Sequence, residues 1–325
     1  MQLMNKMTKL LITAAALLAA GFFCRAEETA GPDATYLFAA RDTCDLYLDI
    51  YEPAPGAPAI SENPTVIFAF GGGFVSGTRN KPSDIKWFRM LNERGIRVVS
   101  IDYRLGLNGA HITGINLEAA RIFGHAIDIA VEDLFSATAF LVENAGTLGI
   151  NPGCIIAAGS SAGAITALEA EWHICNRSEL TSTLPEGFNY AGVMSFAGAI
   201  YSTKGIPAFN EAPCPILMFH GDSDKIVNFG KKQIFGLYFG GSFDLTKIFA
   251  RKGYNYNIYR FTGKSHEIAA SKRHNIAEEM KFIEENVLKG LHRVVDATVD
   301  DPGVITPEWA KRGLMSLYEK TPDTN

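Results

Sequence analysis

The 325-residue sequence has little of several features that mark whole classes of protein. Its 30 lysines and arginines are scattered without a dense basic run, and its net charge is −5, which argues against a nucleic-acid partner. No repeat period and no low-complexity segment occurs, which argues against a repeat architecture. Hydrophobic residues make up 47% of the chain, enough for one large core.

Cysteine is also scarce, with five in the chain. No Cys-x-x-Cys and no clustered His/Cys pattern occurs, so we expect no metal site and no cofactor. Four of the cysteines follow the N-terminal leader. An even number in an exported protein permits disulfides, but these four have no framework spacing. Two of them begin apolar runs, which favours small buried thiols. The four that follow the N-terminal leader are Cys44, Cys154, Cys175 and Cys214.

The apolar run near the N-terminus, residues 10–23, is too short to span a bilayer comfortably. Basic residues precede it and a small residue, Ala26, follows it, which predicts a signal peptide over residues 1–26 and an exported protein. After its removal we expect no membrane span. An uncleaved anchor or a buried helix is the alternative. Cys24 also raises a lipoprotein alternative, but Phe23 stands where a small residue is usual.

Strand and helix patterns alternate along the rest of the chain, after two strands of the alternating type found near a sheet edge. This order predicts an α/β fold with a doubly wound, mainly parallel eight-stranded sheet and antiparallel N-terminal strands. Residues 27–325 are expected to form one domain, with about 293–325 as a C-terminal extension containing a short helix over 307–317. The expected strands are residues 35–40, 45–53, 65–70, 96–103, 154–159, 190–198, 215–221 and 254–261.

Helical spacing of apolar residues, or a helical composition, occurs between these strands. The expected helices are residues 81–93, a long helix within 116–144, a helix from Ala162 onward and a last helix over 274–288. In a doubly wound sheet, functional groups gather at the carboxyl ends of the strands. The residues that follow each strand are therefore the candidates for a site.

One strand end carries a nucleophile pattern, Gly159-Ser160-Ser161-Ala162-Gly163. Small residues at both ends permit a sharp, strained turn in which strand and helix nearly touch. In this register Ser161 is the nucleophile and Ser160 the spacer. The alternative is a close-packing turn with a serine cap.

A serine hydroxyl needs a base to take its proton and an acid to orient that base. In this fold the chain order is Ser, then Asp or Glu, then His. His266 directly follows the last expected strand and is the best base. Asp222 and Asp224 follow the preceding expected strand, residues 215–221. We prefer Asp224 as the acid that orients His266, and Asp222 is expected to cap the turn.

The other six histidines are expected to have no part in catalysis. His220 is interpreted as loop packing beside a glycine, and His111 lies upstream of the serine, in the wrong order. Helical segments carry His125 and His173, which are expected to be structural. His274 and His292 are expected at the surface.

Donors for an oxyanion are expected from two places. One is the backbone N–H of Ala162, directly after the nucleophile, and the others are those of Gly72 and Gly73, because glycine lets backbone N–H groups approach a substrate closely. A triple glycine alone is more often a flexible turn. A phosphate loop is the other alternative, but the chain has no Gly-Lys-Ser/Thr signature.

Together these stretches resemble α/β-hydrolase-fold serine carboxylesterases of the hormone-sensitive-lipase-like and bacterial carbohydrate-esterase groups. The matching stretches run from about residue 64 to 270 in the family's order: GGGFVSG, VVSIDYRL, LGINPGCIIAAGSSAGA, HGDSDKIV and GKSHEIA. The resemblance implies Ser161, Asp224 and His266 as a catalytic triad. It also implies a structural role for Tyr103 and Arg104.

One position departs from the family. A histidine usually precedes the three glycines and braces the oxyanion loop by hydrogen bonds, whereas this chain has Phe70. The departure leaves the proton-transfer chemistry intact, because that histidine transfers no proton. It puts the bracing of the loop in question.

An insertion between the acid and the base, residues 228–253, supplies several aromatic side chains. We expect it either to wall an apolar substrate pocket or to form an ordinary amphipathic helix on the sheet. The segment between the strands at 190–198 and 215–221 is too short for a large lid. The expected pocket residues are Phe74, Phe235, Tyr238 and Phe239.

The favoured function is a carboxylesterase acting through an acyl-enzyme on small or carbohydrate-linked esters. Two alternatives remain: a serine peptidase of the same fold, and a non-catalytic binding protein that keeps the fold. No propeller-sized N-terminal region occurs, which argues against an oligopeptidase. The intact set of serine, histidine and aspartate argues against a binding protein.

Overall fold

The computed structural model describes residues 31–110, 116–203, 205–234 and 237–313. The chain divides into two units, Met1–Gly31 and Pro32–Asn325, and the described elements belong to the second. The predicted signal peptide, Cys24 and His111 lie outside the described residues. Within those ranges, no helix has the length and apolar character that a membrane crossing requires.

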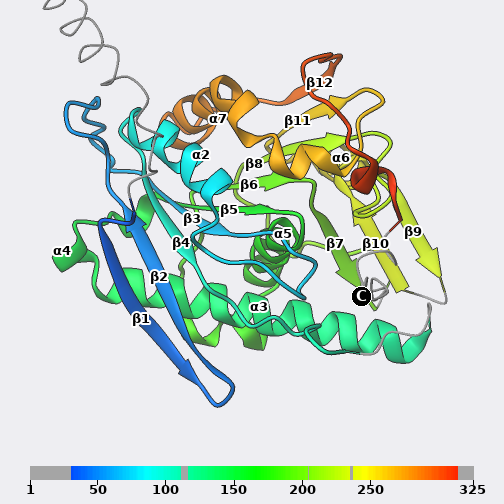
Figure 1. Ribbon diagram of the computed structural model, residues 1–325, viewed down its shortest axis with the longest axis horizontal. Helices are drawn as coiled ribbons and strands as arrows, with labels where there is room; N and C mark the ends of the chain where they lie inside the picture. Colours follow the sequence, from blue (N-terminus) through cyan, green and yellow to red (C-terminus); the bar gives the residue numbers. More distant parts are fainter. Residues whose placement is uncertain (1–30, 111–115, 204, 235–236, 314–325) are drawn as a thin grey trace, which may run out of the picture. The chain divides into compact units, whose positions relative to one another are not determined.

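A large twisted sheet runs through the described unit, and Figure 1 shows helices on both of its faces. The pairs β1–β2 and β2–β4 are antiparallel, and all later neighbours are parallel. The predicted mainly parallel sheet with antiparallel N-terminal strands is therefore confirmed. In spatial order the strands are β1 (Ala34–Arg41), β2 (Cys44–Tyr51), β4 (Arg97–Ile101), β3 (Thr65–Ala69), β5 (Ile155–Ser160), β6 (Gly192–Phe196), β8 (Ile216–Gly221), β11 (Tyr256–Phe261) and β12 (Val295–Val299).

The sheet has nine strands within the described residues, which corrects the predicted eight. The added strand is β12, from the region expected to be a C-terminal extension, and it pairs in parallel with β11. β12 is an edge strand with alternating exposed and half-buried residues. It therefore lacks the apolar run by which the central strands were recognised.

The central strands β3, β4, β5, β6 and β8 are buried throughout, as expected of parallel strands covered on both faces. Neighbouring residues of β6 face opposite helix layers. Phe196 packs against Trp87 of α2 (Pro82–Asn92), whereas Ser195 lies on the side of α5 (Ala162–Cys175). Two layers of helices thus hold the strand ends in fixed positions.

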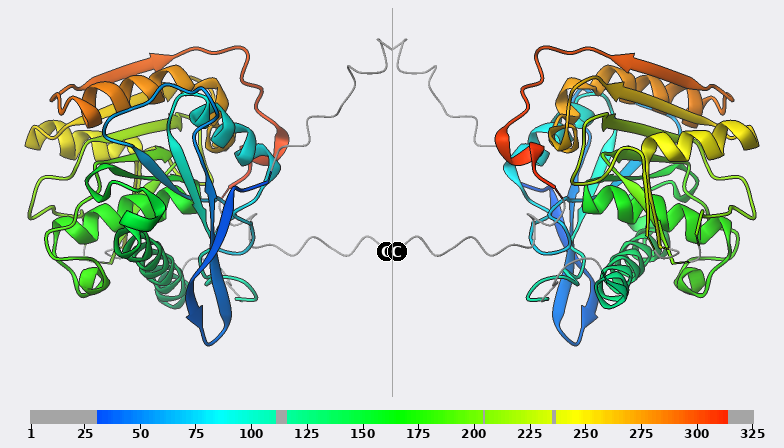
Figure 2. Two further views of the ribbon diagram at one scale, coloured as in Figure 1. Left: turned by 90° about the vertical axis from the view of Figure 1, so that its left-hand side faces the viewer. Right: turned by 90° about the vertical axis from the view of Figure 1, so that its right-hand side faces the viewer.

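The layer on the α5 side also contains the long helix α3 (Leu117–Glu143), which packs along α5. On the other side, the Trp87 indole of α2 donates to Glu279 of α7 (Ile276–Phe282). Figure 2 shows both layers edge-on. The described residues also contain the short α4 (Ala145–Leu148), α6 (Ser242–Lys252) and a π-helical turn that continues α7 (Ile283–Leu288).

The insertion between the acid and the base forms two kinds of structure. Strands β9 (Lys231–Ile234) and β10 (Leu237–Gly241) pair antiparallel, and β10 also pairs with β7 (Ala199–Ser202) to make a small second sheet. The amphipathic helix α6 follows and packs against β8 and β11. The amphipathic helix that was one of the two alternatives is present, and the small sheet was not predicted.

All four cysteines in the described residues are free thiols. Cys44 is exposed, and the two that begin apolar runs, Cys154 and Cys214, are buried as expected. Burial raises the pKa of the Cys154 thiol to about 11, which keeps it protonated and unreactive at neutral pH.

Candidate active site

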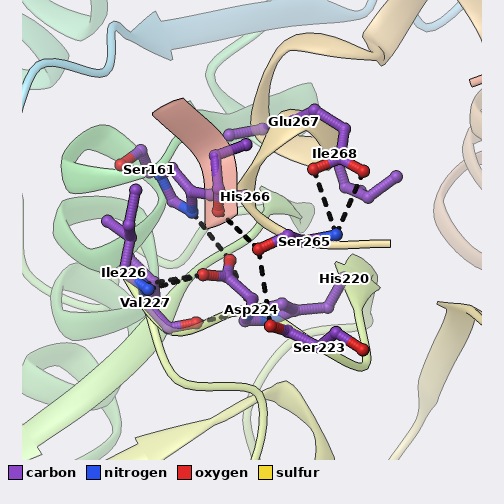
Figure 3. Close-up of polar contacts among 12 residues, drawn as sticks. Ser161, His220, Ser223, Asp224, Ile226, Val227, Ser265, His266, Glu267 and Ile268 are labelled. Atoms are coloured by element: carbon purple, nitrogen blue, oxygen red, sulfur yellow. Dashed lines mark hydrogen bonds and ion pairs between the residues drawn. The ribbon is translucent and has the colours of Figure 1, made fainter. Parts of the chain in front are cut away.

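Three strand ends bring the predicted serine, histidine and aspartate into one hydrogen-bonded chain (Figure 3). The Ser161 hydroxyl lies 2.7 Å from Nε2 of His266, and Nδ1 of the same ring lies 2.7 Å from Oδ2 of Asp224. These residues follow β5, β11 and β8, and all three are buried. The arrangement can move a proton from the hydroxyl to the imidazole, while the carboxylate holds the ring in place.

The backbone at Ser161 has a conformation that residues other than glycine rarely adopt, with φ 53° and ψ −117°. Its N–H donates to the Phe196 carbonyl over 2.9 Å, which anchors the turn to β6. Such strain persists only where surrounding contacts enforce it. The turn projects the hydroxyl from the end of β5 toward His266.

Two glycines permit this turn. A Cβ on Gly159 would lie 2.0 Å from the Gly163 carbonyl oxygen, and a Cβ on Gly163 would lie 2.0 Å from that of Ala69. Neither position has room for a side chain, because both neighbours are backbone atoms. The predicted near-contact of strand and helix is therefore present.

The carboxylate of Asp224 is held at both oxygens. Oδ2 faces His266, and Oδ1 accepts from the N–H groups of Ile226 at 2.8 Å and Val227 at 3.1 Å. Burial alone would raise the pKa of Asp224, but the hydrogen bonds that it accepts from His220 and His266 outweigh burial and lower the pKa to about 2. Asp224 is thus ionised at neutral pH.

Asp222 was expected to cap its own turn through backbone N–H groups, but its backbone partner lies in the loop after β11 instead. Its carboxylate accepts from the Gly263 N–H at 2.8 Å and from the Ser223 hydroxyl at 3.0 Å. The structure therefore places Asp224, and not Asp222, against His266.

His220 is the residue that sequence reasoning missed. It is fully buried at the end of β8, and its Nε2 lies 3.3 Å from Oδ2 of Asp224 and 2.9 Å from the Val227 carbonyl. On the other side of the ring, Nδ1 lies 2.8 Å from the Ser242 hydroxyl. The available signal was the four-residue spacing from His220 to Asp224 around one tight turn.

The glycine loop after β3 lies directly beside the nucleophile. A Cβ on Gly71 would lie 3.2 Å from the Cβ of Ser161. Gly72 and Gly73 have φ of 149° and 64°, and the Gly72 carbonyl accepts from the N–H groups of Val75 and Ser76. Ala162 is the first residue of α5, where a backbone N–H has no acceptor within its own helix. The backbone N–H groups expected to bind an oxyanion therefore come from segments that flank Ser161.

Phe70 braces this loop by packing. Its ring stacks on Tyr103 with centroids 4.5 Å apart, and the Tyr103 hydroxyl donates to the Phe70 carbonyl over 2.8 Å. Gly77 closes over the ring, because a Cβ there would lie 2.5 Å from it. Ring stacking and the hydrogen bond from Tyr103 thus brace the loop, where the resemblance had implied hydrogen bonds from a histidine.

Two of the four expected pocket residues, Phe74 and Tyr238, are buried among other side chains. Phe74 is 1% exposed and packs edge-on against Tyr103 and Phe123, and Tyr238 is fully buried with its hydroxyl donating to Asp244. This corrects the expectation for Phe74 and Tyr238, since neither ring offers surface to a substrate. Phe239 is half-buried, and Phe235 lies outside the described residues.

The other histidines lie elsewhere. His173, at the end of α5, is hydrogen-bonded to Ser178, and burial lowers its pKa to about 4. His125 and His274 are exposed on α3 and on a short turn. Within the ranges that the structure covers, no cluster of His, Cys, Asp and Glu could hold a metal ion.

Comparison with known proteins gives partial matches. Residues 24–170 match the Carboxylesterase family. Carboxylesterase 5A of Ovis aries is 31% identical over 155 residues, which cover 48% of this chain and 35% of that protein. Juvenile hormone esterase of Heliothis virescens is 27% identical over 50% of this chain and 27% of its own length. The chain thus spans about a third or less of these relatives.

Solved structures match over more of the chain. The propionate-bound esterase Est2 of Thermogutta terrifontis is 21% identical, with a TM-score of 0.56 over 79% of this chain and 95% of that one. Its apo form matches with the same TM-score and covers 96% of that chain. The predicted resemblance to carboxylesterases is confirmed, while the hormone-sensitive-lipase-like subgroup stays a prediction. The chain has the α/β-hydrolase fold, and its residues 24–170 match the Carboxylesterase family.

Proposed function

We propose that this protein is a serine carboxylesterase that hydrolyses carboxylic esters through an acyl-enzyme. The observation that carries the proposal is the unbroken hydrogen-bonded chain Ser161–His266–Asp224, which ends beside a glycine loop. The match of residues 24–170 to carboxylesterases supports the choice of esters as substrates.

In the first step, the Ser161 oxygen attacks the ester carbonyl carbon while Nε2 of His266 takes the hydroxyl proton. The carbonyl oxygen becomes an oxyanion, which accepts hydrogen bonds from the N–H groups of Gly72, Gly73 and Ala162. Collapse of this intermediate breaks the bond to the alcohol oxygen. His266 returns its proton to that oxygen, and the acyl group stays on Ser161.

Water completes the cycle. His266 takes a proton from water as its oxygen attacks the acyl carbon, a second oxyanion forms, and collapse returns the proton to Ser161 and releases the acid. Asp224 stays ionised throughout, because its pKa lies near 2. Its carboxylate keeps the remaining imidazole proton on Nδ1, so that Nε2 is free to act as base.

We further propose that the substrates are small or carbohydrate-linked esters, which the resemblance to bacterial carbohydrate esterases supports. Export after cleavage behind Ala26 is part of the same proposal. Expression of the full chain in a Gram-negative host should yield a mature protein that begins at Glu27, as read by N-terminal sequencing. A retained Met1 would contradict it.

One assay tests the function against its rivals. The mature protein and its Ser161→Ala variant are given 4-nitrophenyl acetate, a long-chain 4-nitrophenyl ester and the matching anilides. Turnover of the short ester that falls by at least about a thousandfold in the variant supports the proposal. Preference for the anilide indicates a peptidase, and no turnover at all indicates a binding protein.

A further inference from the structure

The segment after β12 folds back onto the loop that carries His266. The Ser265 hydroxyl donates to the Ala310 carbonyl over 2.5 Å, and the ammonium of Lys264 donates to the Val304 carbonyl over 2.5 Å. Thr306 is also hydrogen-bonded to Glu267. Ser265 and Glu267, which flank His266, and Lys264 therefore hold residues 304–310 in place. Figure 3 shows the reddish ribbon of this segment passing beside His266.

Trp309 stands out within this segment. Val304 and Ala310 are buried and anchor it, whereas Trp309 is 48% exposed, on the short 3₁₀ helix Glu308–Lys311. Its ring lies 6.4 Å from the His266 ring, centroid to centroid, at an interplanar angle of 87°. An exposed indole beside a reactive group offers a flat apolar face on which part of a substrate can pack.

The chemistry decides which part of a substrate reaches this ring. His266 must return its proton to the alcohol oxygen, so the alcohol lies on the His266 side of Ser161. The glycine loop after β3 lies on the other side, because in the sheet β3 and β11 flank β5 in opposite directions. A group attached to the alcohol oxygen is thereby directed toward Trp309.

We propose that Trp309 forms the alcohol subsite of this enzyme and packs against a ring, aryl or sugar, of the ester's alcohol part. The inference rests on the proposed esterase function. A ring offers a flat face that can pack on an indole, whereas an ethyl group is too small to make that contact. The region from β12 to residue 310 thus supplies both an edge strand and a contact for the substrate.

Three acetate esters that differ only in the alcohol test the subsite: ethyl acetate, phenyl acetate and methyl 6-O-acetylglucoside. For Trp309→Ala we expect kcat/KM to fall about five- to tenfold on one or both ring-bearing esters, mainly through KM, and to stay unchanged on ethyl acetate. The ester that loses more identifies the ring as aryl or sugar. Trp309→Phe should retain most of the activity on phenyl acetate.

Ile305→Ala is the matched control, since Ile305 lies on the same segment and is 82% exposed. It should leave all three esters unaffected. Equal losses on all three esters in Trp309→Ala would mean that the ring acts only by packing on His266, and unchanged rates would mean that it contacts no substrate. Either result overturns the subsite while leaving the esterase proposal intact. A wild-type protein that cleaves none of the esters overturns both.

Discussion

At the scale of single residues, the aspartate of the site depends on a second histidine. A carbonyl oxygen can only accept a hydrogen bond, so the 2.9 Å contact to Val227 places a proton on Nε2 of His220. That same N–H also faces Asp224 at 3.3 Å. In the neutral ring Nδ1 is then an acceptor, and the Ser242 hydroxyl donates to it. His220 is therefore a positioning residue for Asp224.

For His220→Ala we expect kcat to fall about ten- to hundredfold with little change in KM. One hydrogen bond to a charged group is lost, worth about 1.5–3 kcal/mol, and Asp224 is freed to move. His220→Gln should recover part of kcat, because its amide can donate to the same carboxylate. Steady-state kinetics on a short aryl ester measure both values.

His173→Ala is the control, because His173 also pairs with a serine but lies far along α5 from Ser161. It should change kcat by less than about twofold. Equal losses in both histidine variants, or an unchanged kcat in His220→Ala, would contradict the positioning role.

The sequence pointed to Ser161 and His266, and to Asp222 or Asp224 as the acid, because each follows an expected strand. The choice of Asp224 rested on the resemblance to the family. Sequence reasoning missed His220, whose role depends on how tightly the turn to Asp224 closes. It also missed the bracing role of Phe70, because a stacked pair with Tyr103 joins residues 33 positions apart. Side-chain partners across loops leave no periodic trace in a sequence.

At the scale of elements, the turn from β5 into α5 depends on close backbone packing. Gly163→Ala would place a methyl group 2.0 Å from the Ala69 carbonyl oxygen, and neither backbone can yield cheaply. We expect a loss of about 2 kcal/mol or more in the free energy of unfolding, and a displaced Ser161. Urea denaturation measures the first, and ester turnover the second.

Gly146→Ala provides the contrast, because nothing lies within 4 Å of the added Cβ in the short helix α4. It should be neutral or stabilise the protein by up to about 1 kcal/mol. A Gly163→Ala variant as stable and active as Gly146→Ala would show that the close contact is not required.

The elements that could be predicted are those whose burial imposes a pattern. Strands β3, β4, β5, β6 and β8 read as continuous apolar runs because both faces are covered. By contrast the first three residues of β9, Lys231 to Gln233, are polar and exposed, and β12 lies at an edge with alternating exposed and half-buried residues. Such strands are specified by their partners more than by their own residues.

At the scale of the whole molecule, a buried carboxyl links folding to pH. Glu279 is fully buried between the helix layer and the sheet, and one of its oxygens accepts from Trp87 while the other has no hydrogen-bond partner. Burial raises its pKa to about 8, although the Trp87 hydrogen bond and the charge of Lys272 oppose the rise. The folded protein therefore holds a proton that the unfolded chain releases near pH 4.5.

The contribution of Glu279 to stability is consequently complete below about pH 4.5 and is lost as pH rises toward 8. Glu279→Gln carries no such proton, so its stability relative to the wild type should increase from pH 5 to pH 8, by on the order of 1–3 kcal/mol. Thermal unfolding across this pH range measures the difference. Glu186→Gln, at an exposed loop position, should show no pH trend, and a flat difference for Glu279→Gln would refute the linkage.

The central claim, that Ser161 is an activated nucleophile, is tested most directly by mass spectrometry after treatment with a fluorophosphonate. The account predicts one adduct per chain, on the peptide that contains Ser161, with no adduct in Ser161→Ala and much slower labelling in His266→Ala. An unlabelled wild-type protein, or an adduct that persists in Ser161→Ala, would contradict it.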